Sequence, residues 1–136
     1  MALSMHLVIF CLLTFSPVVG VHAESERATF TITQQELLQR LVSQANVLIL
    51  DVRTPQEFAT SHIPGAVNVP HTSLPKRLNT VRPYQDKEVI VYCETGFRAG
   101  IAAQGLHRSG FAYVRQLEGD MALWRRTSLP IETSAR

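Results

Sequence analysis

Two short, largely apolar runs, each ending at a polar residue, constrain the fold of this chain more than any other feature. The first run, residues 47–50, is followed by Asp51, and the second, residues 89–92, is followed by Cys93. Runs of this length without alternating polar residues are typical of strands that are covered on both faces, as in a parallel sheet. Ligands bind at the carboxyl ends of the strands in open α/β sheets. We therefore expect Asp51 and Cys93 to lie at one ligand-binding edge.

Helix signals follow some of these strands. Thr33 with Glu36, and Thr54 with Glu57, have the spacing of a capping box. In a capping box, the two side chains bind backbone N–H groups at the start of a helix. The boxes predict one helix that runs to about residue 43 and a second, shorter helix whose first residue is a proline.

The rest of the chain continues the alternation of strand and helix. Short strands are expected at residues 29–32, 66–69 and 113–117, and a helix rich in alanine and glycine at residues 98–109. Asp120 is expected to cap a last helix. This order predicts an α/β domain with a mainly parallel sheet.

The first residues differ in character from the rest. Residues 1–23 contain no Lys, Arg, Asp or Glu, and they include an apolar core and a small residue, Ala23, before Glu24. This layout is typical of a secretory signal peptide, and the alternative is an uncleaved anchor. The apolar run is shorter than the about 20 residues that span a bilayer. We expect cleavage after Ala23, a domain at residues 24–136, and export, which means a periplasmic location if the source is a bacterium.

Cysteine count and charge exclude several classes of function. Removal of the leader, which contains Cys11, leaves Cys93 as the single cysteine, so no internal disulfide can form. A formal net charge of +2 is too small to imply binding to nucleic acid or to an anionic membrane. His62, His71 and His107 lack metal-ligand spacing, and no nucleotide-binding glycine signature is present. We expect no metal and no cofactor.

The thiol of Cys93 stands where an apolar strand gives way to a helix. Free N–H groups and the partial positive charge of a helix start stabilise thiolates and bind anions. Gly96 permits the backbone geometry of a tight anion cradle, and Arg98 offers a planar fork of donors to an oxyanion. This pattern favours a sulfur nucleophile that attacks an anionic substrate. The alternative is an ordinary connection with a surface cysteine and a solvated arginine.

Several ordered segments of the chain resemble the rhodanese family. Residues 51–58 match D-V-R-x-x-x-E-[FY], residues 62–70 match H-I-x-G-A-x-N-[IV]-P, and the loop headed by Cys93 follows a strand. Residues 117–124 are similar to the L-x-G-G-x-x-x-W ending, except that Asp120 replaces the second glycine. The resemblance covers residues 29–128, nearly the whole chain after the leader.

The resemblance implies a three-layer α/β/α domain with a five-stranded, mainly parallel sheet. It also implies sulfur transfer, in which Cys93 takes the outer sulfur of a donor such as thiosulfate and becomes a persulfide. Cyanide, a physiological thiol or a protein acceptor would then collect that sulfur. The substrate-binding loop would comprise Glu94, Thr95, Gly96, Phe97 and Arg98.

The same resemblance implies supporting roles for four residues. Asp51 would tie loops together, Arg53 would pair with Glu57, and His62 would make a structural hydrogen bond. None of these four residues is expected to take part in catalysis, because an ionised thiol needs no general base.

Two rival functions remain open from the sequence. A phosphatase or arsenate reductase of the same fold has a loop one residue longer than the six residues from Cys93 to Arg98, which argues against that function. The phosphatases also usually have a histidine where Tyr92 stands. The other rival is a sulfur-carrier or sensing module with little turnover. Glu94 keeps this second rival open, because an acid beside the nucleophile repels anions unless its side chain points outward.

Overall fold

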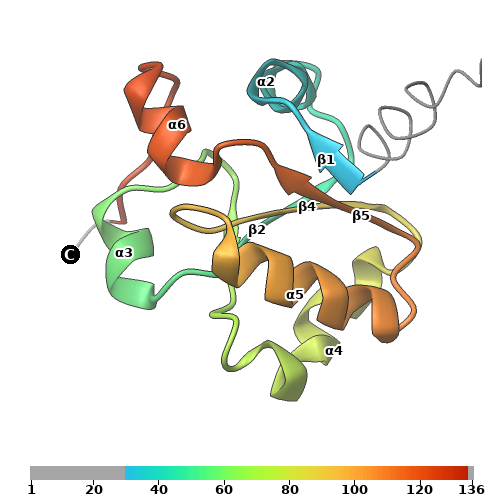
Figure 1. Cartoon of the computed structure of the whole chain (residues 1–136). Coiled ribbons are helices and arrows are strands. Elements are labelled where there is room, and N and C mark those ends of the chain that lie inside the picture. The colour runs from blue at the N-terminus through green and yellow to red at the C-terminus, as the bar shows by residue number, and fades with distance from the viewer. Residues whose placement is uncertain (1–29, 135–136) are drawn as a thin grey trace, which may run out of the picture.

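The computed structural model of the chain describes residues 30–134, and the predicted signal peptide lies outside this range. Its centre is a five-stranded sheet with the strand order β1-β5-β4-β2-β3 (Figure 1). Every pair of neighbouring strands is parallel. The strands are β1 (Thr31–Ile32), β2 (Leu48–Asp51), β3 (Val67–Asn68), β4 (Glu88–Tyr92) and β5 (Tyr113–Leu117). The predicted α/β class with a parallel sheet is confirmed.

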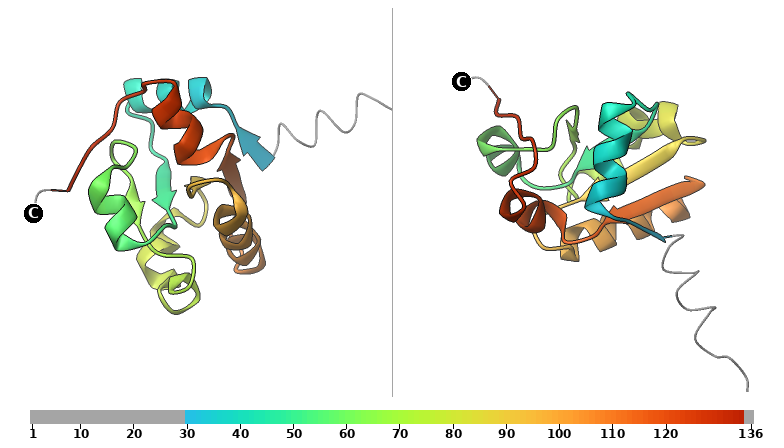
Figure 2. Two further views of the ribbon diagram at one scale, coloured as in Figure 1. Left: turned by 60° about the vertical axis from the view of Figure 1, so that its left-hand side comes forward. Right: turned by 90° about the horizontal axis from the view of Figure 1, so that it is seen from above.

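Helices cover both faces of the sheet and make a three-layer domain (Figures 1 and 2). On one face lie α2 (Gln34–Val42) and α6 (Asp120–Arg126), and on the other lie α4 (Leu78–Val81) and α5 (Phe97–Arg108). The short helix α3 (Pro55–Thr60) follows β2, and two 3₁₀ turns flank α4 at Leu74–Lys76 and Arg82–Tyr84. No helix of residues 30–134 combines the length and the apolar character that a bilayer span requires.

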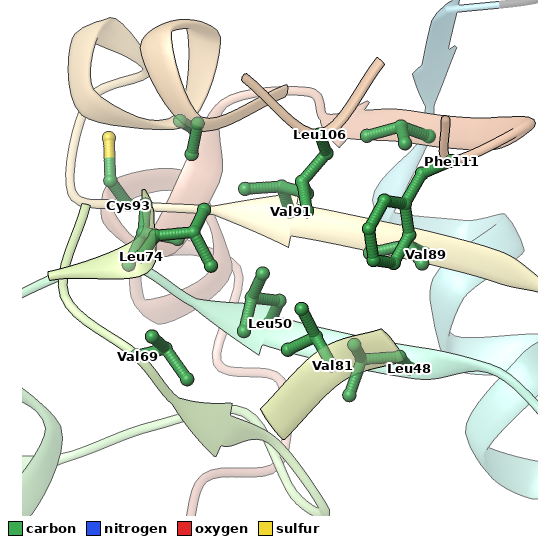
Figure 3. Packing of buried hydrophobic residues seen from close by; sticks show 14 residues of the cluster. Leu48, Leu50, Val69, Leu74, Val81, Val89, Val91, Cys93, Leu106 and Phe111 are labelled. Carbon is green, nitrogen blue, oxygen red and sulfur yellow. The ribbon is translucent and has the colours of Figure 1, made fainter. Parts of the chain in front are cut away.

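Successive residues of the central strands enter two separate hydrophobic clusters. Leu50 and Val91 belong to the cluster that includes Leu106 of α5, which is shown from close by in Figure 3. Ile49 and Ile90 belong to the other cluster, which includes Trp124 of α6. This division follows from the two-residue period of a strand. It explains why both runs are apolar at every position.

Both predicted capping boxes are present. Thr33 and Glu36 form the box at the start of α2, and Thr54 and Glu57 form the box at the start of α3. In each box the threonine accepts a hydrogen bond from the N3 amide, and the glutamate accepts one from the N-cap amide. These contacts span three residues, so the local sequence is sufficient to specify them.

The last helix starts differently from the prediction. Gly119 is the N-cap of α6, and Asp120 is its first residue, with φ of 52°. Within the part of the chain that the structure describes, no side chain makes a capping hydrogen bond at the start of this helix. The predicted capping role of Asp120 is wrong, because its carboxylate is engaged by the loop that follows β4.

Candidate active site

Cys93 directly follows β4, at the carboxyl edge of the sheet. Its Sγ accepts a hydrogen bond from the backbone N–H of Gly96 at 3.1 Å. Gly96 has φ of 108°, a conformation that glycine adopts without a steric penalty, and it forms the N-cap of α5. Cys93 is 1% exposed, yet its sulfur points away from the aliphatic side chains around it and toward the loop that leads into α5 (Figure 3).

The backbone N–H of Cys93 does not bind the sulfur but binds a side chain of α6. It donates a hydrogen bond of 2.8 Å to Oδ1 of Asp120. The sequence predicted a cradle of several amides, but among the described residues the N–H of Gly96 is the one amide that hydrogen-bonds to the sulfur. The tight turn brings this N–H to the sulfur because Gly96 lies three residues further along the chain.

Arg98 lies beside the thiol but is held by an acid from another element. Its two terminal nitrogens donate hydrogen bonds of 2.7 and 2.8 Å to the carboxylate of Glu57 in α3. These hydrogen bonds lower the pKa of Glu57 to about 2, and the same carboxylate raises the pKa of Arg98. The nearby Cys93 thiol adds to the rise in the pKa of Arg98. The expected pairing of Glu57 with Arg53 is wrong, because Arg98 occupies this carboxylate.

Arg53 pairs instead with Asp51 in the interior. The two side chains are 2% and 0% exposed, and Nη2 of Arg53 lies 2.7 Å from Oδ2 of Asp51. The same nitrogen donates a hydrogen bond of 2.7 Å to the backbone oxygen of Ser61. Burial acts to lower the pKa of Arg53, but the hydrogen bonds and charge of Asp51 outweigh it, and the pKa is raised. The pair ties the end of β2 to the segment after α3.

Glu94 lies between two arginines. Its carboxylate is 3.3 Å from Nη1 of Arg53 and also contacts the guanidinium of Arg125 in α6. These two positive charges offset the repulsion that an acid in this loop would exert on an anionic substrate. A shallow pocket of about 310 Å³ adjoins this cluster. It is lined by Arg53, Glu57, Thr60, Ser61, Glu94 and Arg125.

The remaining predicted residues lie around the loop and in its support. Thr95 and Phe97 are exposed, and the side chain of Phe97 is uncovered at the start of α5. His62 is buried, and its Nδ1–H donates a hydrogen bond of 2.8 Å to the backbone oxygen of Phe58. Its ring stacks on the Phe58 ring at 3.7 Å. This hydrogen bond joins the segment that follows α3 to α3 itself, and the structural role of His62 stays a prediction.

Two residues of the site were not predicted from the sequence. Asp120 contacts the Cys93 amide, and Arg125 contacts Glu94. For Asp120 the sequence carried a signal, since an acid stands where the family ending has a glycine. The sequence carried no such signal for Arg125, because a basic residue near the end of a helix is common on any surface.

The family model that matches this chain is that of the rhodanese-like domain, and it spans residues 33–127. The chain belongs to the rhodanese family. A protein named sulfurtransferase from Allochromatium vinosum is 36% identical to this rhodanese-like chain over 100 residues, which are 74% of this chain and 92% of the relative. The thiosulfate:glutathione sulfurtransferase of Saccharomyces cerevisiae is 32% identical over 102 residues, with 65% and 73% of the two chains covered.

Solved structures show the same rhodanese fold. The crystal structure of thiosulfate sulfurtransferase from Pseudomonas aeruginosa superposes with a TM-score of 0.71 at 27% identity. The match covers 78% of this chain and 20% of that longer chain. Within residues 30–134, no group of three or more His, Cys, Asp or Glu side chains is arranged to hold a metal ion.

Proposed function

We propose that this rhodanese-like protein is a sulfurtransferase that moves a sulfane sulfur from a donor such as thiosulfate to a thiophilic acceptor. The observation that carries the proposal is the hydrogen bond of 3.1 Å from the Gly96 N–H to Sγ of Cys93 at the head of a six-residue loop. Arg98 adds a positive charge within reach of the same sulfur. The relatives in Allochromatium vinosum and Saccharomyces cerevisiae are named as sulfurtransferases, which agrees with this chemistry.

The reaction proceeds in two displacement steps on Cys93. In the first, the thiolate attacks the outer sulfur of the donor, the donor S–S bond breaks, and its electron pair leaves with sulfite. The product is a persulfide anion on Cys93. In the second, cyanide or a thiolate attacks the outer persulfide sulfur, and the electron pair of that S–S bond returns to Sγ. This is covalent catalysis of the ping-pong type, and it requires no cofactor.

The residues around the sulfur suit a small divalent anion. The Gly96 N–H and the Arg98 guanidinium provide positive potential where negative charge develops on sulfur and on the leaving sulfite. Arg53 and Arg125 line the neighbouring pocket and balance Glu94. Thr95 and Phe97 are exposed on the same loop and are the side chains that an approaching acceptor meets first.

The place of action follows from the proposed leader. Removal of residues 1–23 would deliver the domain of residues 24–136 to an oxidising compartment, which is the periplasm if the source is a bacterium. A single cysteine suits such a compartment, because no second thiol in the chain can capture it as an internal disulfide. N-terminal sequencing of the exported protein tests this proposal. A chain that still begins at Met1 contradicts it.

A second candidate function is a sulfur carrier that accepts one sulfur and turns over slowly with small donors. The observations that favour it are the burial of Cys93, which is 1% exposed, and the hydrogen bonds of Arg98 to Glu57. A protein acceptor that displaces this pair would then be needed for rapid release.

One experiment tests the function and separates the two candidates. The protein is incubated with thiosulfate and its mass is measured, and thiocyanate production with cyanide, or sulfite release with glutathione, is then followed in the steady state. We expect a gain of one sulfur atom on Cys93 together with sustained turnover. The same gain without turnover indicates the carrier.

The control variant is Cys93→Ser, which should lose both the added sulfur and the activity while its urea unfolding curve is nearly unchanged. A serine variant with full activity would end the proposal. A phosphate ester is assayed in parallel, and its hydrolysis in place of sulfur transfer would assign the chain to the phosphatase branch of the fold.

A further inference from the structure

A groove of about 290 Å³ lies between α5 and the segment of residues 71–78, which pack on the same face of the sheet (Figure 1). Apolar side chains from both segments line it, among them Leu74, Leu78 and Ile101. Ile101 is 45% exposed. None of the described residues that line this α5 groove borders the pocket beside Glu94. An exposed apolar side chain in a concave surface outside the active site is typical of a site that a partner covers.

The α5 groove adjoins the edge of the sheet at which Cys93 lies. His71 lines the groove, and its N–H donates a hydrogen bond of 3.0 Å to the backbone oxygen of Val52, directly after β2. On α5, Phe97 lies four residues before Ile101 and is 79% exposed. Residues four positions apart are neighbours on one face of a helix. Exposed apolar surface therefore continues from the loop of the nucleophile into the groove.

The charged side chains at the α5 groove are basic. Arg108 lines the groove, and Lys76 and Arg77 are exposed in the opposite segment. These three residues, called the basic rim, form no ion pair within the described part of the chain. Residues 59–85 and 95–117, which contain both walls of the groove, include no Asp or Glu. The basic rim thus has no acidic residue of its own walls to balance it.

An apolar groove with a basic rim selects among the possible occupants. A second copy of the chain would meet the same surface at a twofold interface, so cations would face cations. An anionic membrane is a poor fit, because a net charge of +2 is small and a flat surface leaves a concave groove unfilled. An acidic protein segment places an apolar side chain in the groove and its carboxylates on the rim, so both shape and charge are complementary.

We propose that the α5 groove docks an acidic, amphipathic segment of a protein that accepts the persulfide sulfur of Cys93. An apolar side chain of this partner packs beside Ile101, its carboxylates face the basic rim, and Phe97 is covered as the acceptor thiolate approaches. The thiolate attacks the outer persulfide sulfur, and the electron pair of the broken S–S bond returns to Sγ. The identity of the partner as an acceptor rests on the proposed function, whereas the docking does not require sulfur transfer.

The test starts with a displayed library of random dodecapeptides that is selected on the full chain. We expect the selected pool to be enriched in Asp and Glu beside large apolar residues. The dissociation constant of one selected peptide is then measured by fluorescence anisotropy. Arg108→Glu should raise it at least about tenfold, and Ile101→Ala at least about fivefold.

The matched control is Arg126→Glu. Arg126 and Arg108 each lie in the last turn of a helix, both are exposed, and neither forms an ion pair among the described residues. The two arginines belong to α6 and α5, on opposite faces of the sheet. The control should change the dissociation constant less than about twofold. Thiocyanate production from cyanide, which needs no docking, should stay within about twofold in all three variants.

Several results would overturn the proposal. One is a selected pool without an excess of acidic residues, and another is an equal loss of binding in Arg108→Glu and Arg126→Glu. Binding to vesicles that contain phosphatidylglycerol, without any preference for acidic peptides, would assign the groove to a membrane. A dimer in sedimentation that Ile101→Ala dissociates would assign the groove to a second copy of the chain.

A cysteine added to the end of the selected peptide connects docking to sulfur transfer. This peptide should accept sulfur with a KM at least about tenfold below that of free cysteine, and Arg108→Glu should remove the difference. Equal KM values for the two acceptors would overturn the acceptor role of the docked partner. If the chain gains no sulfur from thiosulfate, the proposed function fails, while the dissociation constants still decide whether the groove docks an acidic segment. The two failures are therefore distinguishable.

Discussion

The ion pair of Glu57 with Arg98 should make the stability of this domain depend on pH in the acid range. The pKa of Glu57 falls from 4.5 to about 2, chiefly because Arg98 donates two hydrogen bonds of 2.7 and 2.8 Å. A group with a lowered pKa in the folded state adds stability above its unfolded value. That stability is lost as the pH falls toward the folded value. The contribution of Glu57 should thus be complete above about pH 5 and should vanish near pH 2.

The size of the effect follows from the shift and from the exposure of the pair. At about 1.36 kcal/mol per pKa unit, the shift corresponds to at most about 3 kcal/mol. The Glu57 side chain is 33% exposed, so solvent screening reduces this figure. We expect Glu57→Gln to cost about 1–2 kcal/mol at pH 7 and less than half of that at pH 3. Glutamine still fits the capping box, so the start of α3 is preserved.

The assay is urea unfolding followed by the fluorescence of Trp124, the single tryptophan, which is fully buried in the fold. The matched control is Glu36→Gln, which changes the same capping-box position in α2. Among residues 30–134, the ion-pair partner of Glu36 is Arg115 at 3.8 Å, a longer contact than that of Glu57 with Arg98. We expect a cost below about 0.5 kcal/mol for the control. Equal costs for the two variants, or a cost for Glu57→Gln that does not change between pH 7 and pH 3, would refute the reasoning.

Two further substitutions probe the support of the site. Asp51→Ala leaves the buried charge of Arg53 without its main partner and should cost about 3–5 kcal/mol in urea unfolding, and a cost below about 1 kcal/mol would show that the pair contributes little. Gly96→Ala forces a side chain onto φ of 108° and places its Cβ 3.0 Å from Nε2 of Gln116, so it should cost about 1–3 kcal/mol. Gly105→Ala in the same helix meets no atom within 4 Å and should stabilise by about 0.5–1 kcal/mol, so an equal response of the two glycines in thermal unfolding would contradict this account.

The charges around the thiol are arranged in pairs, with one exception. Acids and arginines meet at Glu57 with Arg98 and at Glu94 with Arg53 and Arg125. These contacts leave the surroundings of the sulfur near electrical balance. Among residues 30–134, Asp120 has no ion-pair partner, and its Oδ1 accepts the backbone N–H of Cys93 instead.

Much of the fold was predictable because its signals are local. Residues 47–50 and 89–92 are apolar at every position, and the strands formed there are buried on both faces. The two capping boxes join residues three positions apart. The position of Cys93 at the end of a strand follows from the same pattern. The edge strands β1 and β3 are shorter than predicted, since each pairs with one neighbour over two residues.

The amino-acid sequence by itself determined the alternation of strands and helices, the starts of the two helices with capping boxes and the position of Cys93 in its loop. Only the tertiary structure decided which charges meet. Arg98 binds an acid 41 residues away, and Asp120 reaches an amide 27 residues away. Local patterns depend on backbone geometry over a few residues. The partner of a buried charge depends on how distant elements pack, and the cost of an unpaired charge in the interior then selects the nearest suitable group.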